Sequence, residues 1–227
     1  PGPSYQQLLD TEKHPVPDCL RENTNPYLGS ENLSVDRYLS REFHEKEVER
    51  IWKRTWQAVC RETEIAQAGD TFVYDITRFS IIVSRTATGE IKAYHNACLH
   101  RGRQLVDKSG NYSHFRCPYH AFSWEIDGRF KWAPCRWDFA HIRDEDFGLP
   151  EVQVGTWGGW VFVNMDPNAV PLQEYLGVLP QHFERWQPET GYKAVHVEKV
   201  IPCNWKIGWE ASIESYHAIA THPQILP

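Results

Sequence analysis

Two cysteine–histidine pairs lie close together near the middle of the chain. Cys98-x-His100 is followed, after sixteen intervening residues, by Cys117-x-x-His120. Each short pair can present two side chains to one metal centre, while the intervening residues bring the two loops together. The residue types and their spacing therefore predict a metal site with four protein ligands.

Two kinds of metal centre use these residue types. A structural zinc site of the Cys2His2 kind would take the same four ligands. In a [2Fe–2S] cluster, the two cysteines could hold one iron and the two histidines the other. Gly102 and Pro118 favour sharply turning loops, which suit a bulky cluster, and the surrounding segment is β-rich and larger than a zinc-dependent finger. These features favour the cluster over zinc.

A second group of ligand-type residues lies near the end of the sequence, at Glu210, Glu214, His217 and His222. On one regular helix the first three would share a face, because their spacing is i, i+4 and i+7. His222 precedes Pro223, and a residue before proline is disfavoured in helical geometry, so His222 can leave the helix and turn back towards His217. A solvated helix face with incidental histidines remains the alternative, since such a histidine pair is weak evidence alone.

Strand-like segments must position the first group. From Trp56 onwards, short runs of β-branched and aromatic residues alternate with turn signals such as Thr88-Gly89 and Asp127-Gly128. This pattern predicts a compact all-β domain that contains both cysteine–histidine pairs. The predicted strands span residues 56–60, 70–76, 79–85, 91–96, 112–116, 122–126 and 160–164.

Helical patterns flank the β region. Residues 40–56 predict a helix, with Ser40 as a candidate N-cap and Glu42 and Lys46 at i,i+4. Its candidate inward residues are Phe43, Ile51, Trp52 and Trp56. The remaining expected elements are an arm with little regular structure at 1–39, helices at 172–186 and 204–220, and a strand at 193–200.

The composition is that of an ordinary globular protein of 227 residues, with 41% hydrophobic and 13% aromatic residues. A formal charge of −6 and the lack of a run rich in lysine and arginine argue against nucleic acid as a partner. No apolar stretch approaches the roughly 20 residues that span a bilayer, and the first residues lack a signal-peptide pattern. We therefore expect a cytoplasmic protein, without a membrane partner, whose six cysteines are thiols or ligands.

The two cysteine–histidine loops resemble those of the Rieske [2Fe–2S] family. The matching segments are ACLHRGRQL at 97–105 and FRCPYHAFSWEIDGRF at 115–130. This resemblance implies that one iron is held by Cys98 and Cys117, and the other by His100 and His120. Histidine ligands would raise the reduction potential above that of an all-thiolate cluster.

The loops depart from other Rieske proteins at four positions. Those of respiratory complexes carry an extra cysteine in each loop, as a disulfide clamp, and a serine two residues after the second histidine. Here these places hold Arg103, Tyr119 and Phe122. We therefore expect a midpoint potential near the low end of the Rieske range, about −150 mV, and a measured value well above zero would contradict this. The family also commonly has Gly-Trp where this chain has Ala121-Phe122, a change that removes no ligand.

The segment CNWKIGWEASIESYHAIATHP, residues 203–223, resembles the iron-binding helix of Rieske non-haem iron oxygenases, and GWVFVNMDP, residues 159–167, resembles their exit from the Rieske domain. The resemblance implies that His217 and His222 bind a mononuclear Fe(II), with a third, carboxylate ligand beyond residue 227. Glu214 matches the carboxylate that relays electrons between subunits, and the alternative is that Glu214 is itself the third ligand.

The chain is thus identified as the N-terminal part of a large (alpha) subunit of the aromatic-ring-hydroxylating type. The resemblance implies three regions: an arm and helix at 1–55 that pack on the catalytic domain, a Rieske domain at 56–168, and the beginning of an α+β catalytic domain at 169–227. The Rieske domain is expected to be an antiparallel sandwich with a two-loop cluster-binding subdomain.

The implied function is that of an oxygenase component, which uses a [2Fe–2S] cluster, Fe(II) and O2 to hydroxylate an organic, preferably aromatic, substrate. Electrons would come from NAD(P)H only indirectly, through a separate reductase or ferredoxin, because the chain has no Gly-rich dinucleotide fingerprint. A homotrimer, with or without a small beta subunit, is expected. Two alternatives are a Rieske monooxygenase or demethylase for a quaternary amine or alicyclic substrate, and a Rieske electron carrier without catalysis.

Overall fold

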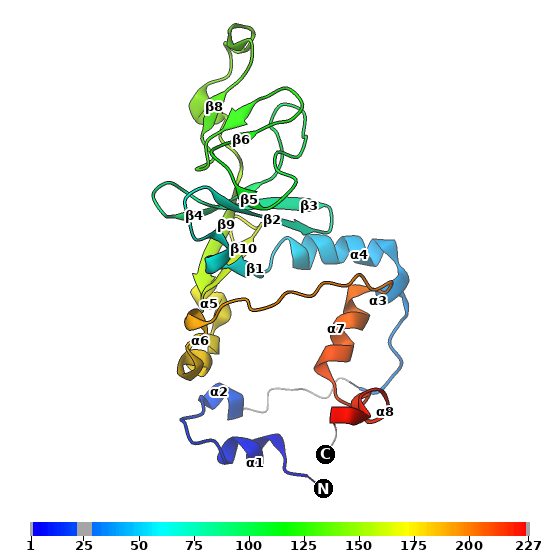
Figure 1. Ribbon diagram of the computed structural model, residues 1–227. Coiled ribbons are helices and arrows are strands. Elements are labelled where there is room, and N and C mark those ends of the chain that lie inside the picture. The colour runs from blue at the N-terminus through cyan, green and yellow to red at the C-terminus, as the bar shows by residue number, and fades with distance from the viewer. Residues whose placement is uncertain (1, 22–28, 226–227) are drawn as a thin grey trace. The chain divides into compact units, whose positions relative to one another are not determined.

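The computed structural model describes residues 2–21 and 29–225, and part of the predicted arm, residues 22–28, lies outside them (Figure 1). The chain divides into two compact units. One consists of Pro1–Pro26 and Trp52–Lys193, and the other of Tyr27–Ile51 and Ala194–Pro227. The two cysteine–histidine pairs therefore belong to the first unit, and Glu214, His217 and His222 belong to the second.

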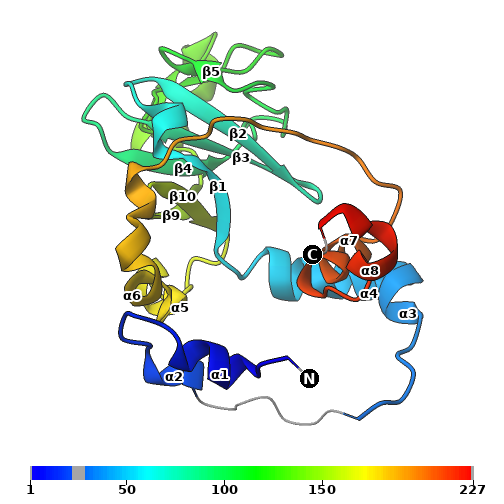
Figure 2. The same ribbon diagram turned by 60° about the horizontal axis from the view of Figure 1, so that its bottom comes forward.

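A seven-stranded antiparallel sheet forms the body of the first unit, as Figures 1 and 2 show. Along the sheet the order is β1 (Gln57–Arg61), β10 (Trp160–Asn164), β9 (Glu151–Trp157), β4 (Ile91–His95), β3 (Phe79–Arg85), β2 (Asp70–Ile76) and β5 (Gly110–Asn111). Each of the pairings between these strands is antiparallel. The predicted all-β fold of this region is confirmed.

Strand β3, which lies inside the sheet between β4 and β2, separates two hydrophobic cores. Ile82 packs on one side, into the core that contains Cys98 and Cys117. Ile81 and Val83 point to the other side, because successive side chains of a strand alternate between faces. The sheet is therefore buried on both faces here, and one face supports the metal loops.

A small three-stranded sheet completes the cluster side of the first unit. It consists of β6 (Phe115–Arg116), β7 (Ser123–Trp124) and β8 (Phe130–Trp132). Phe115, Trp124 and Phe130 are buried in the same core as Cys98 and Cys117. The second metal loop forms the turn between β6 and β7, so aromatic packing beneath these strands supports it.

Strand β9 was not among the predicted strands, although Val152 and Val154 alternate with polar residues in it. Gly155 weakens its β signal, since glycine lowers strand propensity. The structure gives a reason for that glycine: a Cβ at position 155 would lie 2.9 Å from the side chain of Leu172. Because β9 pairs with both β10 and β4, it joins the two halves of the sheet.

Short helices lie beside the sheet in the first unit. α5 (Leu172–Leu176) and α6 (Leu179–Phe183) replace the single helix predicted at 172–186, which is interrupted at Gly177 with φ +56°. α5 buries Leu172 and Leu176 against Trp56. The other helices of this unit are α1 (Tyr5–Asp10), α2 (Asp18–Arg21) and the 3-10 turns Glu62–Ile65, Arg136–Phe139, Asp144–Asp146, Glu184–Trp186 and Pro188–Thr190. The predicted arm thus has more helix than expected, with Ser4 and Gln7 forming a capping box before α1.

The second unit is built from α3 (Asp36–Leu39), α4 (Arg41–Glu47), α7 (Trp205–Ile213), α8 (Ala218–Thr221) and the 3-10 turn Pro223–Ile225. Ser40 caps α4 as predicted, since its Oγ accepts the N–H of Phe43. α4 continues into a π-helix, Val48–Trp52, whose wider turn changes which side chains face inward. Ile51 is consequently exposed, and its prediction as an inward residue is wrong.

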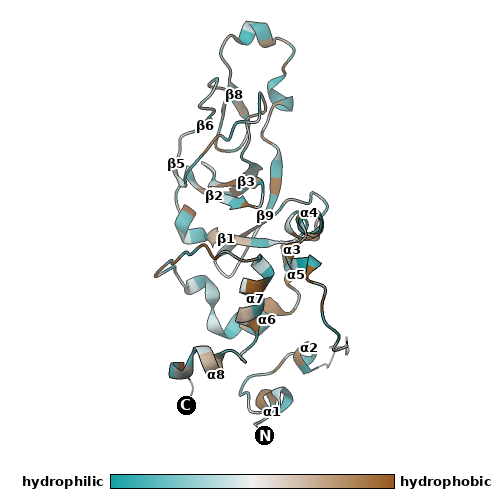
Figure 3. Cartoon of the chain, turned by 90° about the vertical axis from the view of Figure 1, so that its right-hand side faces the viewer, coloured by the Kyte–Doolittle hydropathy of each residue, from teal (hydrophilic) through white to brown (hydrophobic). Residues whose placement is uncertain are grey.

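Two predicted elements of the C-terminal region differ in the structure. Residues 193–200 form no strand, because no described segment pairs with them. The helix predicted at 204–220 ends at Ile213, and a separate helix, α8, begins at Ala218. Asn204 caps α7 by accepting the N–H of Lys206, and Figure 3 shows brown, apolar residues along this helix. Its exposed apolar side chains are Ile207, Trp209 and Ile213.

Candidate metal centres

The first metal loop is closed by two backbone hydrogen bonds. The N–H of Cys98 donates to the carbonyl of Arg103, and the N–H of Gly102 donates to the carbonyl of Cys98, both at 2.8 Å. Gly102 adopts φ +72°, in the left-handed region that glycine enters without steric cost. This turn leaves Cys98 buried in the core and His100 at the exposed tip.

The second metal loop repeats the same turn. The N–H of Cys117 donates to the carbonyl of Phe122 at 2.8 Å, and the N–H of Ala121 donates to the carbonyl of Cys117 at 3.0 Å. Ala121 therefore corresponds to Gly102 of the first loop, and it also has a positive φ, +62°. The two loops are conformational equivalents, although alanine at this place gives no sequence signal for a left-handed turn.

Asn96, which was not among the predicted site residues, closes the base of the first loop. Its Oδ1 accepts the N–H groups of Leu105 and Val106, each at 3.0 Å. Its Nδ2 donates to Ser80 Oγ at 3.0 Å and to the carbonyl of Val106 at 2.7 Å. Asn96 is buried and uses all four hydrogen bonds of its amide, so it holds both ends of the 96–106 segment together. Its position two residues before Cys98 is the only signal in the sequence.

The structure brings the four predicted ligands into two pairs, one of cysteines and one of histidines. The side chains of Cys98 and Cys117 contact each other in the core, and burial raises the pKa of the Cys98 thiol. The rings of His100 and His120 lie with centroids 4.9 Å apart. Nδ1 of His120 is buried without a hydrogen-bond partner among the described residues, which fits a nitrogen that binds a metal.

The arrangement suits a binuclear cluster better than a single ion. Within residues 2–21 and 29–225, no group of three or more His, Cys, Asp or Glu side chains converges as the ligands of one metal ion would. A tetrahedral zinc site needs four ligands at one point, whereas each iron of a Rieske cluster takes only two protein ligands. One pair of cysteines and one pair of histidines meet the second requirement.

The second group is not displayed on one helix face, and that prediction is wrong. Glu214 follows the end of α7 with φ −125° and ψ 160°, an extended conformation. Its carboxylate accepts the N–H of Tyr216 at 2.5 Å, which stabilises the turn after the helix. Glu210, in α7, instead accepts the hydroxyl of Tyr38 at 2.9 Å. The interruption of the helix therefore separates Glu210 from the other three residues.

Glu214 and His217 are hydrogen-bonded, and His222 lies beside His217, but among the described residues the three do not converge on one point as a complete ligand set. Nδ1 of His217 lies 2.5 Å from Oε1 of Glu214, and this hydrogen bond lowers the pKa of the carboxyl. An ionised carboxylate only accepts, so Nδ1 of His217 donates in this hydrogen bond, and Nε2 is the ring nitrogen left to bind a metal. His222 leaves helical geometry as predicted, with φ −128° and ψ 51°. Its ring centroid lies 5.4 Å from that of His217.

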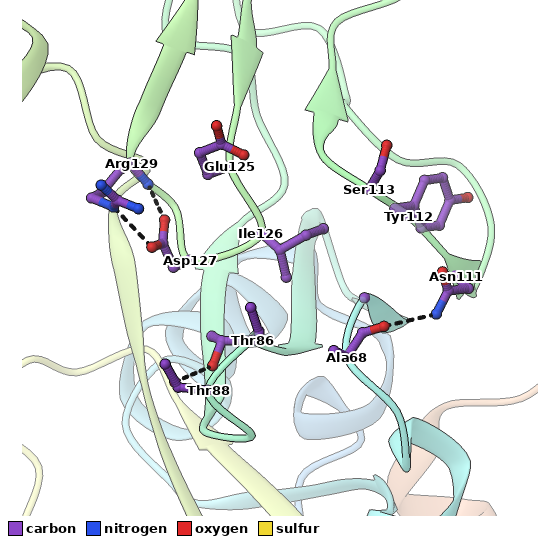
Figure 4. A pocket seen from close by; sticks show the side chains of 12 residues that line it. Ala68, Thr86, Thr88, Asn111, Tyr112, Ser113, Glu125, Ile126, Asp127 and Arg129 are labelled. Atoms are coloured by element: carbon purple, nitrogen blue, oxygen red, sulfur yellow. Dashed lines mark hydrogen bonds and ion pairs between the residues drawn. The ribbon is translucent and has the colours of Figure 1, made fainter.

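A cavity of about 340 Å³ lies elsewhere on the first unit, and Figure 4 shows its lining. Its polar side chains bond to one another: Arg129 Nε lies 2.8 Å from Asp127 Oδ2, and Thr86 Oγ1 lies 2.9 Å from Thr88 Oγ1. None of the predicted metal ligands lines this cavity. We assign it no part in the candidate site.

Two protein families match the chain, and each match contains one of the two candidate metal centres. The Rieske [2Fe-2S] domain matches residues 55–143, which contain both cysteine–histidine pairs. The catalytic domain of the ring hydroxylating alpha subunit matches residues 181–227, which contain Glu214, His217 and His222. The chain belongs to the Rieske oxygenase large subunits. The two matched domains imply a Rieske cluster and a mononuclear iron, which favours the cluster over the zinc alternative.

Curated relatives include both monooxygenases and dioxygenases. The chain is 28% identical to the glycine betaine monooxygenase oxygenase subunit of Pseudomonas aeruginosa, over 96% of this chain and 50% of that protein. It is 34% identical to the biphenyl 2,3-dioxygenase subunit alpha of Rhodococcus jostii, over 81% of this chain and 42% of that protein. The chain spans about half the length of the curated relatives it matches.

Solved structures give the same two kinds of relative. The quaternary ammonium Rieske monooxygenase CntA in complex with L-carnitine superposes with a TM-score of 0.77 at 27% identity, over 84% of this chain and 55% of that chain. Naphthalene 1,2-dioxygenase from Rhodococcus sp. bound to indole superposes with a TM-score of 0.74 at 33% identity, over 81% and 44%. In the part of the Rieske chain that the structure describes, no helix has the length and apolar character to span a membrane.

Proposed function

We propose that this Rieske chain works in the oxygenase component of a multicomponent system that hydroxylates an organic substrate with O2. The observation that carries the proposal is the hydrogen bond between Glu214 and His217 in the second unit, with the ring of His222 beside that of His217. An electron carrier would need only the cysteine–histidine loops. Two histidines and a carboxylate are typical of non-haem iron sites that activate O2.

The ligands proposed for each group follow from the contacts. Cys98 and Cys117 would hold one iron of the cluster, and His100 and His120 the other. When bound, the cluster supplies single electrons, and the mononuclear iron supplies sites for O2 and substrate. The mononuclear iron would be held by two further histidines, His217 and His222.

Glu214 has two proposed tasks. The hydrogen bond that it accepts from Nδ1 orients the ring of His217, so that Nε2 would be left to bind the mononuclear iron. We also propose that Glu214 relays electrons from the cluster of a neighbouring subunit, because its carboxylate already contacts a ligand of the mononuclear iron. This relay requires an oligomer, and we propose a homotrimer, with or without a small beta subunit.

An aromatic compound is the proposed substrate class. It is supported by the 34% identity to the biphenyl dioxygenase subunit and by the match to the ring hydroxylating alpha subunit. A quaternary amine is the second candidate, supported by the 96% coverage in the match to the glycine betaine monooxygenase subunit. Substrate-dependent O2 uptake, measured with biphenyl-type compounds and with betaines in parallel, separates the two classes. We propose a separate reductase or ferredoxin as the electron donor.

Metal analysis and one substitution test the proposal. We expect about three irons per two sulfides in the purified protein. Glu214→Gln should keep both metal centres and lose product formation, because an amide disturbs the relay while leaving the histidines in place. Glu210→Gln is the matched control, since Glu210 bonds to Tyr38 and not to a histidine, and it should retain activity.

Each other outcome has a distinct meaning. Two irons per two sulfides would indicate an electron carrier, and zinc without sulfide would contradict both functions. Loss of the mononuclear iron in Glu214→Gln would make Glu214 a metal ligand instead of a relay. Activity retained in Glu214→Gln would remove Glu214 from electron transfer.

A further inference from the structure

The two histidines of the cluster site have different neighbours. The ring of His100 stacks on Phe122, with centroids 4.7 Å apart and planes inclined by only 13°. Phe139 closes an edge of the same imidazole, at 6.3 Å and 77°. The ring of His120 is instead covered by Tyr119, at 3.7 Å, and that tyrosine is 58% exposed.

Phe122 is held firmly, because it belongs to the core. Only 1% of its surface is exposed. Its ring contacts those of Phe130, Phe139 and Phe147, with centroids 6.4, 5.4 and 6.1 Å away. In a close-packed interior a ring with these neighbours has little freedom to reorient. The plane that Phe122 offers to His100 is therefore set by the fold.

Phe139 is also fixed, through its backbone. Arg136 donates to the carbonyl of Phe139 at 2.7 Å, to that of Ile142 at 2.5 Å and to Asp144 Oδ1 at 2.6 Å. Its guanidinium also lies 5.6 Å from the centroid of the Phe130 ring. These contacts keep the short turn Arg136–Phe139 in place, so the edge contact with His100 is built into the structure.

We propose that Phe122 is a positioning residue for His100. Its ring sets the plane of the imidazole, and Phe139 limits rotation about the ring edge. Groups that surround a metal ligand orient that ligand and tune the properties of the metal. A ring stacked on His100 would therefore influence the reduction potential of the cluster through this histidine. The inference rests on the proposed cluster, and it predicts that the two histidine ligands are held unequally, His100 by the core and His120 by a surface tyrosine.

Leucine substitutions in the intact protein test this inference. Phe122→Leu keeps an apolar side chain but removes the stacked ring. We expect a shift in the EPR g-values of the reduced cluster, a change in its midpoint potential, and about tenfold faster loss of visible absorbance in the presence of a chelator. Phe122→Trp retains a ring, and we expect it to restore the g-values of the unchanged protein.

Phe130→Leu is the matched control. Phe130 is a buried member of the same aromatic core, but its ring is packed on Phe122 and not on His100. Equal shifts in both leucine variants would mean that only core packing matters and would overturn the inference. Phe139→Leu tests the edge contact with His100, and its half-buried position should tolerate the substitution better. If the g-values are unchanged in both Phe139→Leu and Phe122→Leu, the inference is overturned. An unchanged protein that assembles no cluster would refute the proposed function instead.

Discussion

At the residue scale, Ala121 is in a conformation that its side chain disfavours. Its φ of +62° matches the +72° of Gly102, at the equivalent place of the other metal loop. A left-handed conformation costs an L-residue with a Cβ about 1–2 kcal/mol. The loop adopts it because the hydrogen bonds between Cys117 and residues 121 and 122 require it.

Ala121→Gly should therefore stabilise the protein. The relief of strain exceeds the extra backbone entropy of glycine in the unfolded chain, so we expect a gain of about 0.5–1 kcal/mol in the free energy of unfolding. Gly102→Ala is the matched reverse change, and it should lose about 1 kcal/mol. Denaturant titration of the cluster-loaded protein measures both, and a loss of stability in Ala121→Gly would contradict the prediction.

At the element scale, α4 and α7 are joined by a buried ion pair. The Glu47 carboxylate, only 4% exposed, accepts from Lys206 Nζ at 2.5 Å and from the indole of Trp205 at 3.2 Å. Burial would raise the pKa of Glu47, but these two hydrogen bonds outweigh it, and the pKa is lowered below the ordinary 4.5. The charge of Lys206 is further stabilised by the rings of Tyr38 and Phe43.

Glu47→Gln should destabilise the protein at neutral pH by about 3 kcal/mol, because it leaves the ammonium of Lys206 without its buried counter-charge. A lowered pKa means that the contribution of Glu47 is complete above about 4.5 and is lost as the pH falls through the lower folded value. The difference between the two proteins should shrink in that acidic range.

Urea titrations at pH 7 and at pH values below 4.5 measure this prediction. Glu42→Gln is the control, because Glu42 pairs with Lys46 at the surface of the same helix, and it should leave the free energy of unfolding almost unchanged at both pH values. A Glu47→Gln deficit that is equal at both pH values would show that the charge of Glu47 is not its source.

At the scale of the whole molecule, the two candidate metal centres belong to different compact units of the chain. The cysteine–histidine loops depend on the sheets of the first unit, and the Glu214 group depends on α7 and α8 of the second. Each centre is therefore held by the secondary structure of its own unit, and a substitution that abolishes one centre is expected to leave the other folded. This separation makes it possible to inactivate the two centres in different chains.

Mixed oligomers then test the proposed relay between subunits. We expect Glu214→Gln chains and Cys117→Ser chains, each inactive alone, to regain part of the product formation when they are co-assembled. In such an oligomer, the intact cluster of a Glu214→Gln chain can pass electrons to the intact Glu214 of a Cys117→Ser chain. Product per mononuclear iron is the measurement, with each variant assembled with itself as the control. No recovery would mean that electrons pass within one subunit.

The candidate ligands could be predicted from the sequence alone. The metal loops could be predicted because ligand types and short spacings are local features, as at Cys98, His100, Cys117 and His120. The proline after His222 likewise restricts the backbone of that histidine directly. The all-β character of the Rieske region was equally readable, since strand periodicity is local.

How the remaining groups are held depends on tertiary contacts that no local pattern predicts. Asn96 bonds to residues that lie nine or more positions away in the sequence. No local sequence signal favours the left-handed conformation of Ala121 or the end of α7 before Glu214. Strand β9 was missed because its glycine is explained by Leu172, which packs against it from another element. Local preferences are weak beside hydrogen bonds and close packing, and these contacts exist only once the chain has folded.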